Sequence, residues 1–379
     1  MTAIYPRTGA ATERAPRPRP SDPALVDLLD KIAAGEPLDL QDGRACFATK
    51  DLTGLGAIAN WAAQARHGDV VYFNINRHVN PSNICAIKCK LCAFGTTARD
   101  PSSYAHSVDE VVERARHHPP GATEIHMVGG LHPDFNIEYY ERLFEALRTQ
   151  LPHLHIQALT MVELDYVAGI SNLSLRETIL RLKEAGLGSI PGGGAEIFDR
   201  AVRDQICRPK ISGERWLEVA EEVHRCGLKS NCTMLFGHVE TIDHRLDHLD
   251  RLRRLQERTS GFQCLIPLPF LPENTYLDHL PGPDGVDILK TYAVSRLMLH
   301  NIPHLKAFWI MVGLRLAQTS LHYGVNDLDG TVVEEHIMHD AGSTAPQGLT
   351  LEQLLHLIRA AGKSPVQRDT VYNVVRTYG

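Results

Sequence analysis

Segments with the periodicity of a β-strand alternate with helical segments from about residue 69 onward. The strand candidates are rich in β-branched and aromatic residues, and the segments between them repeat apolar residues at helical spacing. Eight alternations predict parallel strands joined by crossover helices, the α/β pattern of a TIM-type (β/α)8 barrel. The predicted strands are residues 70–78, 124–128, 155–160, 189–191, 229–236, 261–268, 304–310 and 325–328.

The helices predicted between these strands cover residues 108–117, 138–151, 175–185, 213–226, 242–260, 286–301 and 313–323. A doubly wound open sheet is the alternative fold. It would usually carry a glycine-rich phosphate turn after its first strand, and here that turn carries cysteines.

The rest of the chain divides into three parts. Residues 1–23 are rich in proline, arginine, alanine and threonine, so we expect a disordered tail. Residues 24–68 predict a small N-terminal helical element, with helices near residues 25–32 and 52–66. The barrel and a C-terminal extension then occupy residues 69–379, with a last helix at 351–361 followed by an extended tail.

Three cysteines, Cys85, Cys89 and Cys92, follow the first predicted strand. Thiolates are soft ligands suited to iron–sulfur clusters or zinc. Three of them would leave one iron of a cubane without a protein ligand, open to a substrate. A structural zinc site needs a fourth ligand at short spacing, and the nearest candidate, His78, is seven residues upstream. The spacing therefore favours a [4Fe–4S] cluster, with zinc or unligated thiols as alternatives.

Composition excludes several classes of function. The formal net charge of -6 gives no electrostatic case for nucleic-acid binding. No apolar run approaches the length of a membrane span, and the N-terminus lacks the apolar core of a secretory signal. The tight cysteine triplet suits a reducing interior, so we expect a cytoplasmic protein. The remaining cysteines share no metal-type spacing, and we interpret them as buried apolar residues.

Reactive groups of such barrels lie where strands end and loops begin. Gly129 and Gly130 follow the second strand, and a Gly-Gly pair lets the backbone approach a ligand closely. After the third strand, Glu163 or Asp165 is a candidate to bind a ribose diol, with helix capping as the alternative. Three glycines around Gly193 follow the fourth strand and suggest a backbone pressed against a flat ligand or another segment, or a mobile loop.

The fifth strand alternates polar and apolar residues. Ser230, Cys232 and Met234 are predicted on one face, and Asn231, Thr233 and Leu235 on the other. His238 then stands at the rim, as a site residue or a structural histidine. Lys306 is a candidate partner for a substrate carboxylate, but we expect an ordinary surface lysine.

The pattern Cys85-x-x-x-Cys89-x-x-Cys92-x-Phe94, with Gly129-Gly130 after the next strand, resembles the radical S-adenosylmethionine (SAM) superfamily. The resemblance implies a [4Fe–4S] cluster whose open iron is chelated by SAM, and reductive cleavage of SAM to methionine and a 5′-deoxyadenosyl radical. It implies that Phe94 lines the adenine pocket and that the two glycines meet the methionyl amine. The acidic residue usual after those glycines is replaced by Leu131-His132.

Within the superfamily, the chain resembles the futalosine branch of menaquinone synthesis, and most of all the aminofutalosine synthases, from about residue 24 to residue 376. His132 and Phe198 favour the synthases over the related dehypoxanthine futalosine cyclases. The segments that carry this likeness are residues 78–85, 129–133, 192–198, 210–216, 230–238 and 328–335.

This likeness implies that the adenosyl radical adds to the vinyl carbon of 3-[(1-carboxyvinyl)oxy]benzoate. Rearrangement and loss of the carboxyl carbon then give aminofutalosine, so the enzyme is a transferase that consumes SAM. The reductant would be an electron donor such as flavodoxin or ferredoxin. Catalytic candidates are His238, Asn231 and Thr233. Candidates for contact with SAM or the substrate are Phe94, Gly129, Gly130, His132, Glu163, Gly193 and Ser230.

Three other functions remain open from the sequence. The first two are a dehypoxanthine futalosine cyclase and an enzyme like the deazaflavin FO synthase, both with the same cluster. The third is a zinc-stabilised binding module without catalytic activity. Such a module would be colourless, whereas a cluster gives a brown protein that absorbs near 400 nm.

Overall fold

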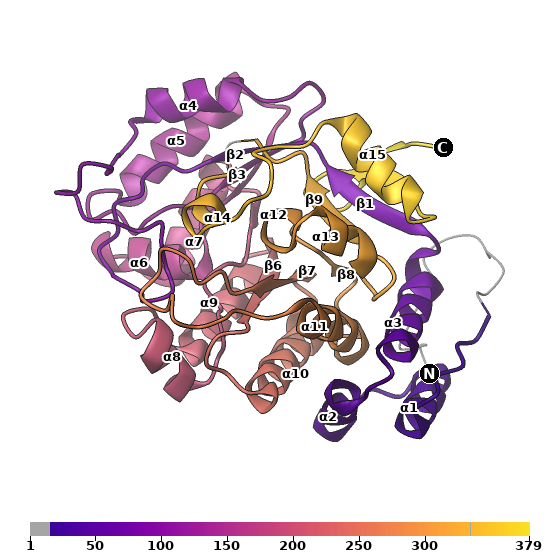
Figure 1. Ribbon diagram of the computed structural model, residues 1–379. Coiled ribbons are helices and arrows are strands. Elements are labelled where there is room, and N and C mark those ends of the chain that lie inside the picture. The colour runs from indigo at the N-terminus through magenta and orange to yellow at the C-terminus, as the bar shows by residue number, and fades with distance from the viewer. Residues whose placement is uncertain (1–15, 334) are drawn as a thin grey trace.

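Seven parallel strands form the main sheet of the computed structural model, which describes residues 16–333 and 335–379. Their order in the sheet follows their order in the chain, and helices surround them (Figure 1). The seven are β2 (Asn76–Val79), β3 (Glu124–Met127), β4 (His155–Ala158), β5 (Ser189–Ile190), β6 (Lys229–Phe236), β7 (Phe262–Pro269) and β8 (His304–Leu305).

An eighth strand, β9 (Asp327–Gly330), closes the ring. It pairs in parallel with β1 (Val70–Asn74), which precedes β2 with only Ile75 between them. A parallel bridge joins Lys306, just after β8, to Asp327 of β9. β9 therefore lies between the last strand and the first, and the predicted (β/α)8 architecture is confirmed.

The last two predicted strands needed correction. The segment predicted as strand 304–310 is a strand only over β8, and it turns into the short helix α12 (Trp309–Val312). An unbroken apolar run such as Phe308–Val312 has the same composition in a buried strand and a buried helix, so its pattern does not separate the two. The predicted strand 325–328 lies two residues further on, at β9.

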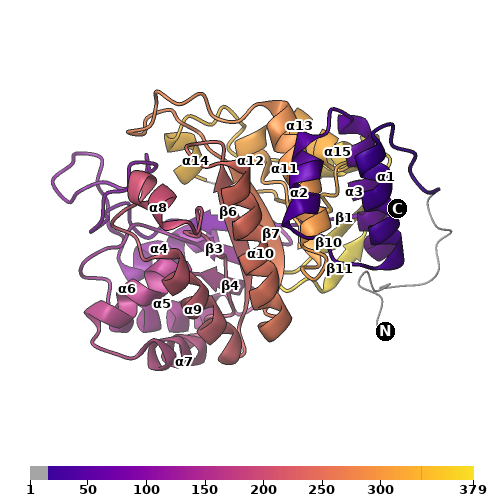
Figure 2. The ribbon, with the colours of Figure 1, turned by 90° about the horizontal axis from the view of Figure 1, so that it is seen from below.

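Most crossover helices lie where the sequence predicts them, but several short ones were not predicted. The predicted helices are α4 (Val108–Arg116), α5 (Ile137–Gln150), α7 (Leu175–Ala185), α9 (Gly213–Arg225), α10 (Ile242–Thr259), α11 (Gly285–Met298) and α13 (Leu314–Ser320). Those not predicted are α2 (Leu40–Ala48), α6 (Met161–Ile170), α8 (Arg200–Ile206), α12 and α14 (Ile337–Asp340). In Figure 2, α8, α12 and α14 lie toward the same end of the barrel; they follow β5, β8 and β9.

The N-terminal element consists of α1 (Pro23–Ala34), α2 and α3 (Leu52–His67), which lie beside α10 and α11 (Figures 1 and 2). Residues 1–15 of the predicted tail lie outside the described residues. Residues 16–22 lead into α1, and the Ser21 hydroxyl donates to Asp51 at 2.9 Å.

The C-terminal extension contains strands as well as a helix. After α15 (Leu351–Ala360), the segment expected as an extended tail forms β10 (Ser364–Arg368) and β11 (Val374–Thr377). β10 pairs in parallel with β1, and β11 pairs antiparallel with β10. Because β1 lacks a neighbour on that side, β10 satisfies its free backbone groups. No helix in the described part of the chain is long and apolar enough to cross a membrane.

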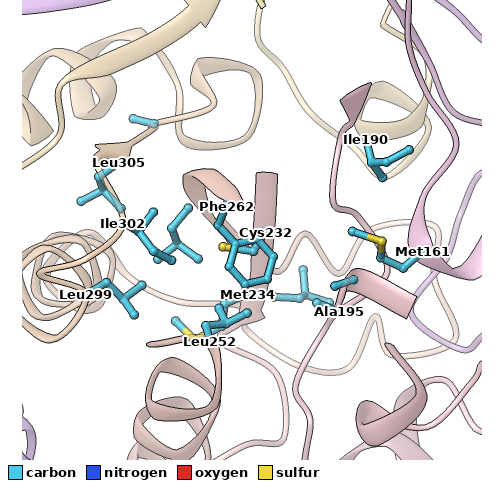
Figure 3. Packing of buried hydrophobic residues seen from close by; sticks show 14 of the residues in the cluster. Met161, Ile190, Ala195, Cys232, Met234, Leu252, Phe262, Leu299, Ile302 and Leu305 are labelled. Atoms are coloured by element: carbon cyan, nitrogen blue, oxygen red, sulfur yellow. The ribbon is translucent and has the colours of Figure 1, made fainter. Parts of the chain in front are cut away.

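Strand β6 separates the core from the interior of the barrel. Cys232 and Met234 are fully buried, close to Phe262 and to Leu252 of α10 (Figure 3). The alternate residues Asn231, Thr233 and Leu235 line the cavity inside the barrel. The predicted alternation therefore gives β6 one apolar face packed on helices and one partly polar face toward the site.

Candidate active site

A cavity of about 310 Å³ opens among the loops that follow the barrel strands. The cysteine loop after β2, the Gly-Gly turn after β3 and the glycine loop after β5 all line it. Residues of α14, after β9, cover another side. The carboxyl ends of the strands therefore meet at one hollow, as expected for a (β/α)8 barrel.

The Gly-Gly turn holds the cysteine loop. Gly130 N–H donates to Ser82 O at 2.8 Å, and Ala86 N–H donates to Leu131 O at 2.8 Å. A Cβ added at Gly130 would lie 2.2 Å from Ile84 O. Only glycine lets these two backbones approach so closely. The contact between Gly130 and Ile84 therefore fixes the position of the adjacent Cys85.

The three cysteines face the same cavity. The Cβ position built on Gly95 lies 3.6 Å from Cys92 Sγ and 3.9 Å from Cys85 Sγ, so these two sulfurs lie on one side of the loop. Cys85 Sγ also accepts from Leu131 N–H at 3.4 Å, and Cys92 Sγ from Gly95 N–H at 3.3 Å. Such donors stabilise a thiolate. Burial raises the pKa of Cys89 to about 12, which a bound metal would reverse.

In residues 16–333 and 335–379, no three His, Cys, Asp or Glu side chains converge closely enough to hold one metal ion. A cubane has a different requirement, since each thiolate binds a different iron corner. Three cysteines at the wall of one hollow therefore fit the three thiolate ligands of a [4Fe–4S] cluster.

Seven of the other predicted site residues also line the cavity. They come from the loops after β2 and β3, the start of α6, the glycine loop and strand β6: Phe94, Gly129, Gly130, Glu163, Gly193, Asn231 and Thr233. The structure thus brings together residues from five separate segments.

Glu163 lines the cavity but is already engaged by the backbone. It is the third residue of α6 and forms a capping box with Thr160, whose N–H donates to Oε2 at 2.6 Å. Its Oε1 accepts from Gly129 N–H at 3.0 Å. Burial raises the pKa of Glu163 to about 7, and the backbone donors oppose that rise. The carboxylate therefore caps α6 and ties it to the Gly-Gly turn. This role resembles the helix-capping alternative predicted from the sequence.

The glycine loop after β5 is packed against β6 and α6. Gly192 has φ +81°, and a Cβ there would lie 2.1 Å from Asn231 O. Gly194 has φ +83°, and its Cβ would lie 2.5 Å from Val162. Thr233 Oγ1 donates to Gly192 O at 3.0 Å. These contacts require glycine and fix the loop to other chain segments, which is one of the predicted explanations for the glycine run.

Three predicted site residues do not line the cavity. The Ser230 hydroxyl lies on the outer face of β6, 2.9 Å from His224 Nε2. The His238 ring is fully buried, with Nε2 3.2 Å from Leu235 O and Nδ1 3.0 Å from Glu240. His132 stacks on Phe135, and its Nδ1 accepts from Asp134 N–H. We leave these three out of the site.

Sequence reasoning missed two ion pairs that line the cavity. Lys210 pairs with Glu196 at 2.5 Å, and Lys306 pairs with Asp329 at 2.9 Å. Burial opposes the charged form of Glu196, yet the adjacent Lys210 lowers its pKa. Lys306 is only 5% exposed, so the expectation of a surface lysine was wrong. Lys306 follows β8 and forms the bridge that joins β8 to β9. A single lysine after a predicted strand does not indicate that the barrel closes there.

Comparison with known proteins gives the family. A profile described as "Radical SAM superfamily" matches residues 79–252, and one described as "CofH/MqnC C-terminal region" matches residues 259–378. The solved structure of a methylornithine synthase superposes with a TM-score of 0.72 at 17% identity, covering 89% of this chain and 97% of that one. This likeness supports the fold alone.

Three curated relatives are similar over most of their length. An aminodeoxyfutalosine synthase of Thermus thermophilus is 43% identical over 94% of this chain and 97% of that protein. One of Streptomyces coelicolor is 40% identical over 93% and 94%. A cyclic dehypoxanthine futalosine synthase of Streptomyces coelicolor is 36% identical over 92% and 88%. The chain therefore belongs to the radical SAM superfamily, as an enzyme of the group that includes the aminodeoxyfutalosine synthases, and uses a [4Fe–4S] cluster and SAM.

Proposed function

We propose that this enzyme is an aminofutalosine synthase of menaquinone biosynthesis. It would combine SAM with 3-[(1-carboxyvinyl)oxy]benzoate to give 6-amino-6-deoxyfutalosine. The observation that carries this proposal is the identity of 43% and 40% to two aminodeoxyfutalosine synthases, over more than nine-tenths of the chain. His132 and Phe198, the two residues that favour the synthases in the sequence, add to it.

The chain's own residues would hold the cluster and SAM at the mouth of the barrel. Cys85, Cys89 and Cys92 would bind three irons, and Phe94, 6% exposed beside them, would pack on the adenine. The Gly129 and Gly130 backbone would border the methionyl group. When bound, cluster and SAM supply a 5′-deoxyadenosyl radical.

The walls below the cysteine loop would keep water away from the reacting carbons. Leu235 of β6, Ile266 and Leu268 of β7, and Phe308 and Met311 near α12 line this part of the cavity. A carbon radical must meet only its intended partner, and an apolar wall offers no competing polar group.

Asn231 and Thr233 would orient the substrate from strand β6. Asn231 is 4% exposed and lines the cavity, with its amide able to donate and accept. Thr233 is tied to Gly192 and so holds the glycine loop in place. Both stand on a rigid strand, which suits the positioning of a substrate better than a loop would.

Electrons would reach the cluster from a separate side. Cys92, Phe94 and Gly95 also line a second cavity of about 740 Å³. Lys88, at its rim, lies over the Tyr276 ring at 5.0 Å, and both side chains are exposed. We propose that a small electron donor, such as a flavodoxin or ferredoxin, approaches here, because this cavity opens beside Cys92, one of the residues that would hold the cluster.

The test is an anaerobic assay of the reconstituted protein with SAM, a reductant and the carboxyvinyloxybenzoate. We expect one adenosylated, decarboxylated product for each SAM consumed, identified by mass spectrometry. Free 5′-deoxyadenosine without an adduct would contradict the proposal. The same assay with dehypoxanthine futalosine tests the second candidate, the cyclase, which the relative at 36% identity supports.

A further inference from the structure

A polar cluster lies inside the barrel, deeper than the cysteine loop. It consists of His78 of β2, His126 of β3, Lys306 after β8 and Asp329 of β9, and we call it the floor cluster. The two imidazole rings stack with their centroids 4.5 Å apart. His78 and His126 lie within their strands, whereas the three cysteines follow the end of β2, so the floor cluster lies on the barrel side of the cavity and the cysteines lie on its loop side.

The floor cluster has hydrogen-bonding capacity that the protein does not use. Lys306 has three N–H donors, and contacts among the described residues occupy one, to Asp329 at 2.9 Å. His126 uses Nδ1 toward Gln157 at 3.2 Å, and His78 uses Nε2 toward Asn76 at 3.4 Å. A lysine that is 5% exposed and keeps free donors facing a cavity is costly unless a ligand satisfies it.

The substrate of the proposed function requires such a partner. It has one carboxylate on the vinyl ether, which is lost, and one on the arene, which is retained. The carboxylate that is lost must lie beside the reacting carbons and hence near the cysteine end. The arene carboxylate then points away from that end, past the apolar walls formed by Ile266 and Leu268.

We infer that Lys306, with His78 and His126, binds the arene carboxylate of the substrate. This inference rests on the proposed function and adds the residues that select a 3-carboxyphenyl group. Asp329 holds the lysine in place and would accept one of its hydrogens, while the other donors meet the carboxylate. The second buried pair, Lys210 and Glu196, lies close to Cys89 at the other end, so it serves as a matched control.

The experiment compares the full substrate with its analogue 2-phenoxyacrylate, which lacks the arene carboxylate. The test variant is Lys306→Met with Asp329→Asn, because removing the lysine alone would leave a buried carboxylate unpaired. We expect kcat/KM for the full substrate to fall roughly 10- to 100-fold, the range for a lost charge-assisted hydrogen bond, and kcat/KM for the analogue to change little. The control, Lys210→Met with Glu196→Gln, should lower both equally.

Equal losses for both substrates in the Lys306/Asp329 variant would overturn the inference, and so would no loss. Absorbance near 400 nm and SAM cleavage without substrate show that the variant folds and loads its cluster. A binding measurement separates this inference from the proposed function. Calorimetry with 3-methoxybenzoate should show binding by the wild-type chain and at least 10-fold weaker binding by the variant, whether or not the wild-type enzyme forms an adduct.

Discussion

Gly130 lies so close to Ile84 that a Cβ on the glycine would stand 2.2 Å from the Ile84 carbonyl oxygen. The contact joins the turn after β3 to the residue that precedes Cys85. Both partners are backbone, so neither can swing aside as a side chain would. The position of the first cysteine therefore depends on a glycine 45 residues away in the sequence.

We predict that Gly130→Ala displaces the cysteine loop and prevents stable cluster binding. The cost of forcing the two backbones apart should be about 1–3 kcal/mol or more. Iron content after anaerobic reconstitution should fall to a small fraction of the wild-type value. The control is Gly169→Ala in α6, because a Cβ added there meets nothing within 4 Å. This control variant should bind iron normally. Normal iron binding by Gly130→Ala would contradict the role assigned to this contact.

Replacing Cys89 with serine should abolish the cluster. Wild-type protein should hold roughly four irons per chain and absorb near 400 nm, whereas the variant should be colourless. Cys207→Ser is the matched control, because Cys207 is also buried and close enough to influence the pKa of Cys89, but does not line the cavity. Zinc in place of iron in the wild-type chain would instead support the binding-module alternative.

The sequence predicted most of the fold because its signals were local. Alternation along β6 correctly separated Asn231, Thr233 and Leu235 from Cys232 and Met234, since strand periodicity depends on neighbouring residues alone. The pairing of β10 with β1 joins segments almost 300 residues apart, and no local pattern announces it. The short helices α6 and α8 were overlooked because glycines and polar residues surround them.

The site was less predictable than the fold, for the same reason. The cysteine spacing is local and pointed to the cluster. A polar residue at a strand end can face inward or outward, and Ser230 and His238 both face away from the cavity. Lys306 and Asp329 meet only because β9 closes the ring beside β8, and no local sequence pattern announces that closure.

Glu163→Gln should make stability depend less on pH. Burial raises the folded pKa of Glu163 to about 7 from an ordinary value near 4.5. Between these values the unfolded chain releases a proton that the folded chain keeps, so this residue lowers wild-type stability as pH rises from 4.5 to 7. Glutamine cannot titrate, but it leaves Gly129 N–H or Thr160 N–H without an acceptor, at a cost of about 1–3 kcal/mol.

Urea unfolding of the full chain at pH 5, 6, 7 and 8 measures this difference. The variant should be clearly less stable than wild type at pH 5, and the gap should narrow toward pH 8. Asp165→Asn on the same helix removes a partner of Arg215 near the surface and should cost at most about 1 kcal/mol. A gap that stays constant or widens with pH would show that Glu163 is ionised in the folded chain throughout.

His238→Gln should affect stability rather than chemistry. The ring is fully buried behind the cavity wall, where its nitrogens contact Leu235 O and Glu240, and Glu240 in turn pairs with Arg245 at 2.7 Å. Glutamine keeps polar atoms but not this geometry, so we expect a loss of about 1–3 kcal/mol. Turnover per cluster-loaded chain, measured well below the unfolding temperature, should stay close to the wild-type value.

Asn231→Ala should lower turnover more than stability, the reverse of His238→Gln, because Asn231 lines the cavity and would contact the substrate. A large loss of turnover in His238→Gln at unchanged stability would return His238 to the catalytic site.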